Sequence, residues 1–156
     1  MDVKSPITDF SKDPYLQLVR PLVKAYLAFV RLGNRHIESL GVTPAQFEVI
    51  AELGNTNGLT CIELTEATLI TKGTLTGVLD RLEGKGLIRR DAVKGDRRAI
   101  KIQLTKKGET LYWKVFPAHA EFLRPLLKQA FTAEEIEELI QKLAKLRRSF
   151  ESAPSV

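Results

Sequence analysis

Residues 71–108 read TKGTLTGVLDRLEGKGLIRRDAVKGDRRAIKIQLTKKG, a helix pattern followed by a hairpin pattern. Apolar residues three and four apart predict a helix over 72–85, which Gly86 ends. Strict alternation then predicts a returning strand over 99–104, paired with a strand that begins near Leu87. The expected buried stripe of the helix is Leu75, Val78, Leu79 and Leu82, and the expected inward face of the returning strand is Ile100, Ile102 and Leu104.

Positive charge is concentrated in this stretch. The whole chain carries 24 Lys/Arg and 19 Asp/Glu, a net charge of +5. Nine basic and two acidic residues stand between Lys85 and Lys107, so the local excess exceeds that of the whole chain. This distribution favours an anionic partner near the hairpin, and a merely solvated hairpin tip is the alternative.

Threonine caps mark the helix starts. The tetrapeptides TPAQ (43–46), TCIE (60–63) and TAEE (132–135) are capping boxes, which predict helices beginning at residues 44, 61 and 133. Thr71 and Thr105 are expected to cap helices that begin near residues 72 and 106.

A longer helix is expected over 14–40, bent by Pro21 and closed by Gly41. The last two helices are expected over 106–131 and 133–150. The predicted order is α-α-α-α-β-β-α-α, a mainly α fold with a small β-wing.

Several classes of function find no support in the sequence. The 156 residues contain one cysteine, which excludes an internal disulfide and suits a reducing compartment. No stretch approaches the length of a membrane span, and the N-terminus has no apolar signal region, so a cytoplasmic protein is expected. No G-x-S-x-G, P-loop, G-x-G-x-x-G or H-E-x-x-H motif is present, so we expect no enzyme and no cofactor. His36 and His119 lack a ligand-like grouping, so no metal site is expected.

The helix over 72–85 has the composition of a DNA recognition helix. Small, hydroxyl and basic side chains let a helix enter the major groove and donate hydrogen bonds to base edges. An ordinary polar helix face is the alternative, but the basic hairpin that follows favours DNA. The candidate contacts are Thr71, Lys72, Gly73, Thr74, Thr76, Gly77 and Arg81.

The hairpin tip supplies a second set of candidate contacts. A helix-turn-helix followed by a hairpin is a winged helix, and an arginine on the wing finds enhanced negative potential in a narrow minor groove. The candidates are Lys94, Asp96, Arg97 and Arg98, with Asp96 expected to orient an arginine by ion pairing.

These motifs resemble the MarR family of transcriptional regulators. Residues 96–108 are similar to the family's wing signature, D-x-R followed by an alternating strand and L-T-x-x-G. Residues 74–90 resemble its recognition helix and first wing strand, and 43–53 its second helix. The resemblance extends over about residues 14–150.

The resemblance implies a homodimer on a palindromic operator. Helical regions 14–42 and 109–150 would form the dimer interface, and 43–108 the winged helix-turn-helix lobe that binds double-stranded DNA, all within one compact domain. It also implies that Arg98 enters the minor groove with Asp96 as its orienting partner. Gly77 departs from the pattern, because many members carry a larger, often basic, residue there.

Two features of the sequence are candidates for regulating DNA binding. The family often binds small aromatic anions, and the candidates for lining such an effector pocket are Tyr26, Phe29, Tyr112 and Trp113, with core packing as the alternative. Cys61 stands first in the helix over 61–68, where the helix dipole favours negative charge, so a thiol switch is one hypothesis. A small buried residue packed beside Ile62 and Leu64 is the alternative. Oxidation-sensing members carry their cysteine near the start of the first helix, where this chain has none.

The resulting hypothesis is a sequence-specific regulator, a repressor that occludes a promoter as a homodimer and is released by a small aromatic effector. A winged-helix protein-interaction module without a specific operator is the alternative. Its basic strip would then bind an acidic partner.

Overall fold

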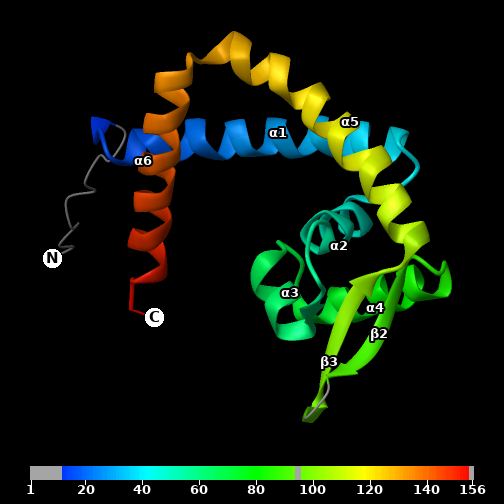
Figure 1. Cartoon of the computed structure of the whole chain (residues 1–156). Coiled ribbons are helices and arrows are strands. Elements are labelled where there is room, and N and C mark those ends of the chain that lie inside the picture. Colours follow the sequence, from blue (N-terminus) through cyan, green and yellow to red (C-terminus); the bar gives the residue numbers. More distant parts are fainter. Residues whose placement is uncertain (1–11, 94–95, 155–156) are drawn as a thin grey trace, which may run out of the picture. The chain divides into compact units, whose positions relative to one another are not determined.

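The computed structural model describes residues 12–93 and 96–154, and these are mostly helical with one small antiparallel sheet (Figure 1). The elements in chain order are η2 (Leu16–Leu18), α1 (Val19–Ser39), α2 (Pro44–Leu53), β1 (Leu59–Thr60), α3 (Cys61–Ala67), α4 (Lys72–Gly84), β2 (Ile88–Val93), β3 (Asp96–Leu104), α5 (Lys106–Ala130) and α6 (Ala133–Glu151). The predicted order is confirmed, with β1 as an addition that the sequence did not reveal. The chain divides into two compact units, one ending at Tyr112 and the other beginning at Trp113.

The predicted capping boxes are present. Thr43 Oγ1 accepts a hydrogen bond from the backbone N–H of Gln46, whose side chain accepts one from the N–H of Thr43, each at 3.2 Å. Thr60 at the start of α3 and Thr132 at the start of α6 make the same reciprocal arrangement. Each box satisfies two N–H groups that the first helical turn leaves without partners.

The two simpler threonine caps behave differently from each other. Thr105 Oγ1 accepts the N–H of Gly108 at 3.1 Å and so caps α5. Thr71 occupies the N-cap position of α4, but its hydroxyl donates to Thr74 Oγ1 at 3.1 Å and caps no N–H group. The predicted side-chain cap at Thr71 is therefore wrong.

The first helix starts later than predicted. Asp13 Oδ1 accepts the N–H of Tyr15 at 2.8 Å, and a 3-10 turn follows before α1 begins at Val19. Pro21 lies in the first turn of α1, where no backbone N–H needs an acceptor within the helix, so α1 continues through it.

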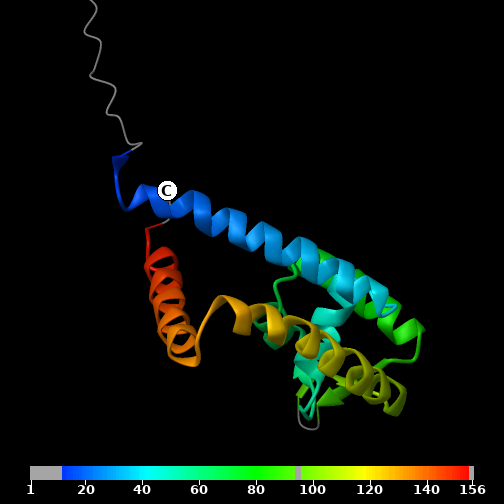
Figure 2. The same cartoon turned by 90° about the horizontal axis from the view of Figure 1, so that it is seen from above.

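The apolar face of α1 is largely uncovered. Val23 and Tyr26 are 47% and 55% exposed, and only Gly33 and Ile37, toward the C-terminal end, are buried. Figures 1 and 2 show the reason, because the C-terminal end of α1 lies beside α2 while its N-terminal half extends away from α2, α3 and α4. The predicted periodicity was correct, but the described residues of this unit leave most of the face uncovered.

The core of the first unit lies between α2, α3, α4 and the sheet. Strand order is β1-β3-β2, so β3 is central, and Ile102 at its middle is fully buried opposite Leu59 and Arg90. The predicted stripe of α4 is confirmed, since each of its four members is at most 2% exposed. The buried cluster comprises Val49, Ile50, Leu53, Leu64, Leu75, Val78, Leu79, Leu82, Leu87, Ile88, Ile102 and Tyr112.

The hairpin of β2 and β3 extends away from these helices (Figure 1). β3 begins at Asp96, three residues earlier than predicted, and the pairing shifts register between Ala92 and Val93. Ile100 is 48% exposed, although it shares a strand face with buried Ile102, because it lies beyond the packed core.

The base of the hairpin is joined tightly to α4 and α5. Gly86 has φ +69°, and the N–H of Leu87 reaches back to the carbonyl of Leu82 at 2.9 Å, as in a Schellman motif. Thr105 Oγ1 donates to the carbonyl of Gly86 at 2.6 Å. Gly108 packs directly on the Leu87 carbonyl, where a Cβ would collide, which explains the glycine that ends the L-T-x-x-G motif.

Among the described residues, no helix has the length and apolar character needed to cross a membrane.

Candidate nucleic-acid interface

The outer face of α4 carries the predicted recognition residues. All are exposed except Gly77, which is half-buried. Leu75 and Val78 on the opposite face are 2% and 1% exposed, so burial of one face of α4 presents the other to solvent. Within the described part of the chain, neither Lys72 nor Arg81 belongs to an ion pair, so both cations remain available to an external anion.

The predicted wing residues are only partly described. Asp96, Arg97 and Arg98 lie in β3, and Asp96 is opposite Val93 in the hairpin. Their side chains are outside the described part of the structure, and so is the whole of Lys94. The backbone therefore places three of the four candidates on the hairpin that follows α4.

A charged cluster joins the wing to the recognition helix. Arg90 in β2 donates from Nη2 to Asp80 Oδ1 of α4 at 2.6 Å and from Nη1 to Glu83 of the same helix. The hydrogen bond to Asp80 is the largest of the effects that raise the pKa of Arg90 above its ordinary value. This arginine stays charged and holds the base of β2 against α4, so it positions the wing. Sequence reasoning counted it only as part of a basic patch.

A second arginine is committed to partners within the sheet region. Arg89 donates to Asp91 at 2.7 Å and to Gln103 Oε1 at 2.7 Å. Gln103 in turn donates to the carbonyl of Asn57 at 2.8 Å, which ties the hairpin to the loop before β1. Of the six basic residues in this stretch whose side chains the structure describes, Arg89 and Arg90 have carboxylate partners, so the positive charge available to DNA is smaller than the sequence count suggests.

The four candidate effector-pocket residues have different environments. Tyr112 is 5% exposed and belongs to the core cluster, and its hydroxyl accepts a hydrogen bond from Asn55 Nδ2 at 3.0 Å. Core packing, the alternative interpretation, therefore describes Tyr112. Tyr26, Phe29 and Trp113 are each more than half exposed, and Trp113 opens the second unit.

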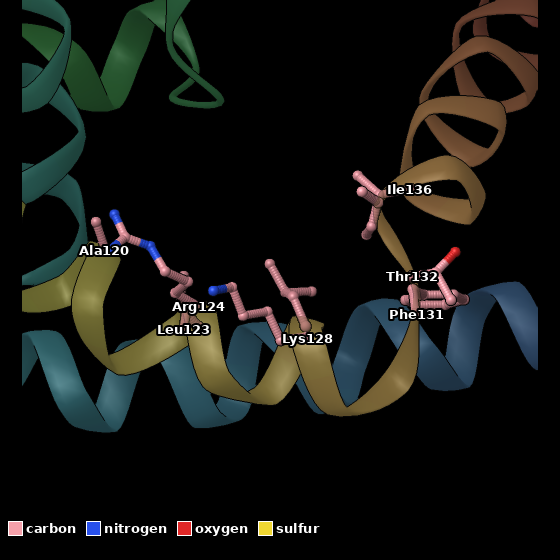
Figure 3. A pocket seen from close by; sticks show the side chains of 9 residues that line it. Ala120, Leu123, Arg124, Lys128, Phe131, Thr132 and Ile136 are labelled. Atoms are coloured by element: carbon pink, nitrogen blue, oxygen red, sulfur yellow. The ribbon is translucent and has the colours of Figure 1, made fainter.

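A cavity that the sequence did not predict lies where α5 meets α6 (Figure 3). Its volume is about 590 Å³, and none of the four candidate pocket residues lines it. Its walls are mostly apolar, and Arg124 and Lys128 add two cations. The apolar lining includes Leu123, Leu127, Phe131 and Ile136.

Cys61 is the first residue of α3, as predicted, but it is exposed. Its neighbour Ile62 is 72% exposed, so the interpretation of a small buried residue packed in the core is wrong. Among the described residues, no group of three or more His, Cys, Asp or Glu side chains could hold a metal ion.

Comparison with known proteins identifies the family. The sequence profile of the MarR family matches residues 42–100. The HTH-type transcriptional regulator MhqR of Bacillus subtilis (strain 168) is 30% identical over 131 residues, which cover 84% of this chain and 90% of MhqR. The chain belongs to the MarR family, and it is a DNA-binding transcriptional regulator with a winged-helix fold.

Solved structures show the same fold. A mutant MarR from Escherichia coli in complex with operator DNA superposes with a TM-score of 0.72 at 27% identity, over 86% of this chain and 98% of that one. BpsR from Bordetella bronchiseptica, whose DNA binding is regulated by 6-hydroxynicotinic acid, gives a TM-score of 0.72 at 26% identity, over 84% and 98% of the two chains.

Proposed function

We propose that the protein is a homodimeric repressor that binds a palindromic operator and is released from it by a small aromatic anion. The observation that carries this proposal is the outer face of α4 beside the basic hairpin. Exposed threonines there accompany Lys72 and Arg81, neither of which has an ion-pair partner among the described residues. Hydroxyl and cationic groups on an exposed helix suit base edges and phosphates of duplex DNA.

Homodimer formation is supported by uncovered apolar surface. On α1, Val23, Tyr26 and Leu27 are 47–55% exposed, and on α6, Ile140 and Phe150 are 62% and 66% exposed. We assign regions 14–42 and 109–150 to dimerisation and 43–108 to the DNA-binding lobe. A two-fold dimer would place two copies of α4 about one helical turn of DNA apart, which requires a palindromic operator.

Release by an aromatic anion rests on the relatives. DNA binding by BpsR is regulated by 6-hydroxynicotinic acid, a small aromatic acid. Tyr26 and Phe29 in the first unit expose aromatic surface that such a ligand could contact, and Trp113 in the second unit is a separate candidate. Thermal shifts with a panel of aromatic acids that includes 6-hydroxynicotinic acid test this part, and a panel that leaves the melting temperature unchanged contradicts it.

Operator binding is tested by fluorescence anisotropy against the DNA upstream of the protein's own gene, with unrelated duplex as competitor. At about 150 mM salt we expect specific binding roughly a thousandfold tighter than competitor binding. Complete displacement by the competitor would contradict self-regulation. If selection from random duplexes then also yields no preferred sequence, the protein-interaction module remains, with an acidic partner for the basic hairpin.

A further inference from the structure

Gly77 and Arg81 lie one helical turn apart on α4, and the arginine covers the glycine. A Cβ at Gly77 would lie 3.8 Å from Nη1 and 4.0 Å from Nη2 of Arg81, with no other side chain of the described residues within 4 Å. Side chains of a helix lean toward its N-terminus, so residue 81 naturally lies over position 77. The guanidinium therefore occupies the surface that a side chain at position 77 would otherwise fill.

The other two glycines of α4 are not covered by a neighbouring side chain. At Gly73 and Gly84 an added Cβ would have no neighbour within 4 Å. Arg81 thus places its cationic group at one particular position on the outer face of α4 rather than along its whole length.

The positive charge of Arg81 is also not neutralised by a carboxylate of the described residues. The two acidic residues nearest to it in α4, Asp80 and Glu83, are both bound by Arg90 from β2. Within the described residues no salt bridge includes Arg81 itself. Arg90 therefore occupies the local carboxylates, and the charge of Arg81 remains for an external ligand.

We propose that Arg81, seated over Gly77, contributes to sequence specificity by reading one guanine in each half-site. This inference rests on the proposed DNA-binding function. An arginine fork matches O6 and N7 of guanine in the major groove and is the commonest specific base contact. The absence of a side chain at position 77 allows Arg81 to approach the bases from one turn further along the helix.

The experiment is selection of preferred duplexes from a randomised pool, followed by competition assays on single-base variants. The proteins are the wild-type chain, Arg81→Ala, Arg81→Lys, Gly77→Gln and the double variant Gly77→Gln/Arg81→Ala. Lys12→Ala is the control, because Lys12 is an exposed cation that precedes the regions assigned to dimerisation and DNA binding. Circular dichroism verifies that each variant keeps the helical content of the wild type.

We expect Arg81→Ala to lose discrimination at one guanine per half-site by roughly 5- to 150-fold, the range of one bidentate contact. Arg81→Lys keeps the charge but not the fork, so it is expected to lose the same discrimination with an unchanged salt slope. Gly77→Gln is expected to displace the guanidinium of Arg81 and so weaken the preference for guanine. When Arg81 is already alanine, the same substitution is expected to have no further effect on that preference. Lys12→Ala is expected to select the wild-type motif.

Two results would overturn the inference while leaving the proposed function intact. One is selection of an unchanged motif by Arg81→Ala, which would make Arg81 a phosphate contact. The other is an equal effect of Gly77→Gln with and without Arg81. A wild-type protein that selects no motif would overturn the proposed function, and this inference with it.

Discussion

Arg90 Nη2 in β2 lies 2.6 Å from Asp80 Oδ1 in α4, and with its second bond to Glu83 this arginine joins the first wing strand to the recognition helix. In the proposed complex the two elements would contact DNA at the same time, α4 in the major groove and the wing in the minor groove. A fixed angle between them reduces the entropy lost on binding, because the wing need not be ordered separately.

Replacing Arg90 is therefore expected to lower operator affinity by more than the loss of one positive charge would. Arg90→Ala should lower the free energy of unfolding by about 1 kcal/mol, since the pair is partly exposed. It should also weaken operator binding severalfold more than Arg89→Ala, which removes the same charge from the same strand. Urea denaturation and anisotropy measure the two effects. Equal loss of affinity in both variants would show that Arg90 acts through charge and not through position.

Recognition helix and wing are expected to respond differently to truncation. Thr76 is exposed on α4, so Thr76→Ala should change which sequences are preferred. Arg98→Ala should weaken binding to all duplexes and reduce the magnitude of the salt slope by about one charge. Salt titrations on a panel of duplexes separate these outcomes. Identical sequence selectivity in wild type and Thr76→Ala would rule out base reading by Thr76.

An acidic residue on the apolar face of α1 is expected to prevent dimerisation. Val23 is 47% exposed, and Val23→Asp would place a charge in the proposed interface. Sedimentation should then show a monomer whose operator affinity is at least tenfold lower. Ala28→Asp adds the same charge to an exposed position on the opposite side of the helix and should leave the dimer intact. A dimer that survives Val23→Asp would place the interface elsewhere.

A substitution at Tyr112 tests whether this side chain belongs to the core or lines an effector pocket. Tyr112→Phe removes the hydroxyl that accepts from Asn55 Nδ2 at 3.0 Å, and should lower the free energy of unfolding by about 1 kcal/mol. Because this ring is buried in the core, the midpoint of release by an aromatic anion should not change. Denaturation curves with and without ligand provide the measurement. Unchanged stability together with lost ligand response would assign Tyr112 to the pocket after all.

Acid is expected to weaken the start of α3. Hydrogen bonds from the backbone and side chain of Thr60 lower the pKa of Glu63 below 4.5. The folded state therefore favours the ionised carboxylate, so its stabilising effect is complete above the unfolded pKa and is lost as pH falls through the folded one. Glu63→Gln keeps a capping side chain but cannot titrate, so its stability should fall less between about pH 6 and pH 3. Parallel curves for the two proteins would contradict this role.

Local contacts explain why most helix starts were predictable. The caps at Thr43 and Thr132 join residues three apart, so the short tetrapeptide contains all the partners. The failure at Thr71 is equally local, because its hydroxyl is oriented to donate to Thr74 Oγ1, three residues on, and accepts no backbone N–H of α4. The apolar stripe of α4 was likewise visible, since helical spacing alone puts its members on one face.

Distant partners explain what the sequence did not reveal. β1 has only two residues, too few for any periodic pattern, and exists because Leu59 and Thr60 pair with Ile102 and Lys101 of β3. The exposure of Cys61 and the burial of Tyr112 depend equally on what packs against them. No spacing within the chain indicated that Arg90 would meet Asp80.

The sequence by itself determined where the helices after the first begin, which face of α4 is apolar, and that a basic hairpin follows it, because these depend on neighbours within one or two turns. Only the tertiary structure decided which cations remain free for a partner. Arg90 is bound by two carboxylates of α4 because β2 packs against that helix, and Arg89 is bound by Asp91 of its own strand. Within the described residues Arg81 forms no ion pair, because Arg90 takes the carboxylates nearest to it on α4. An ion pair forms only where the fold brings the two charges within hydrogen-bond distance, which a count of residues cannot show.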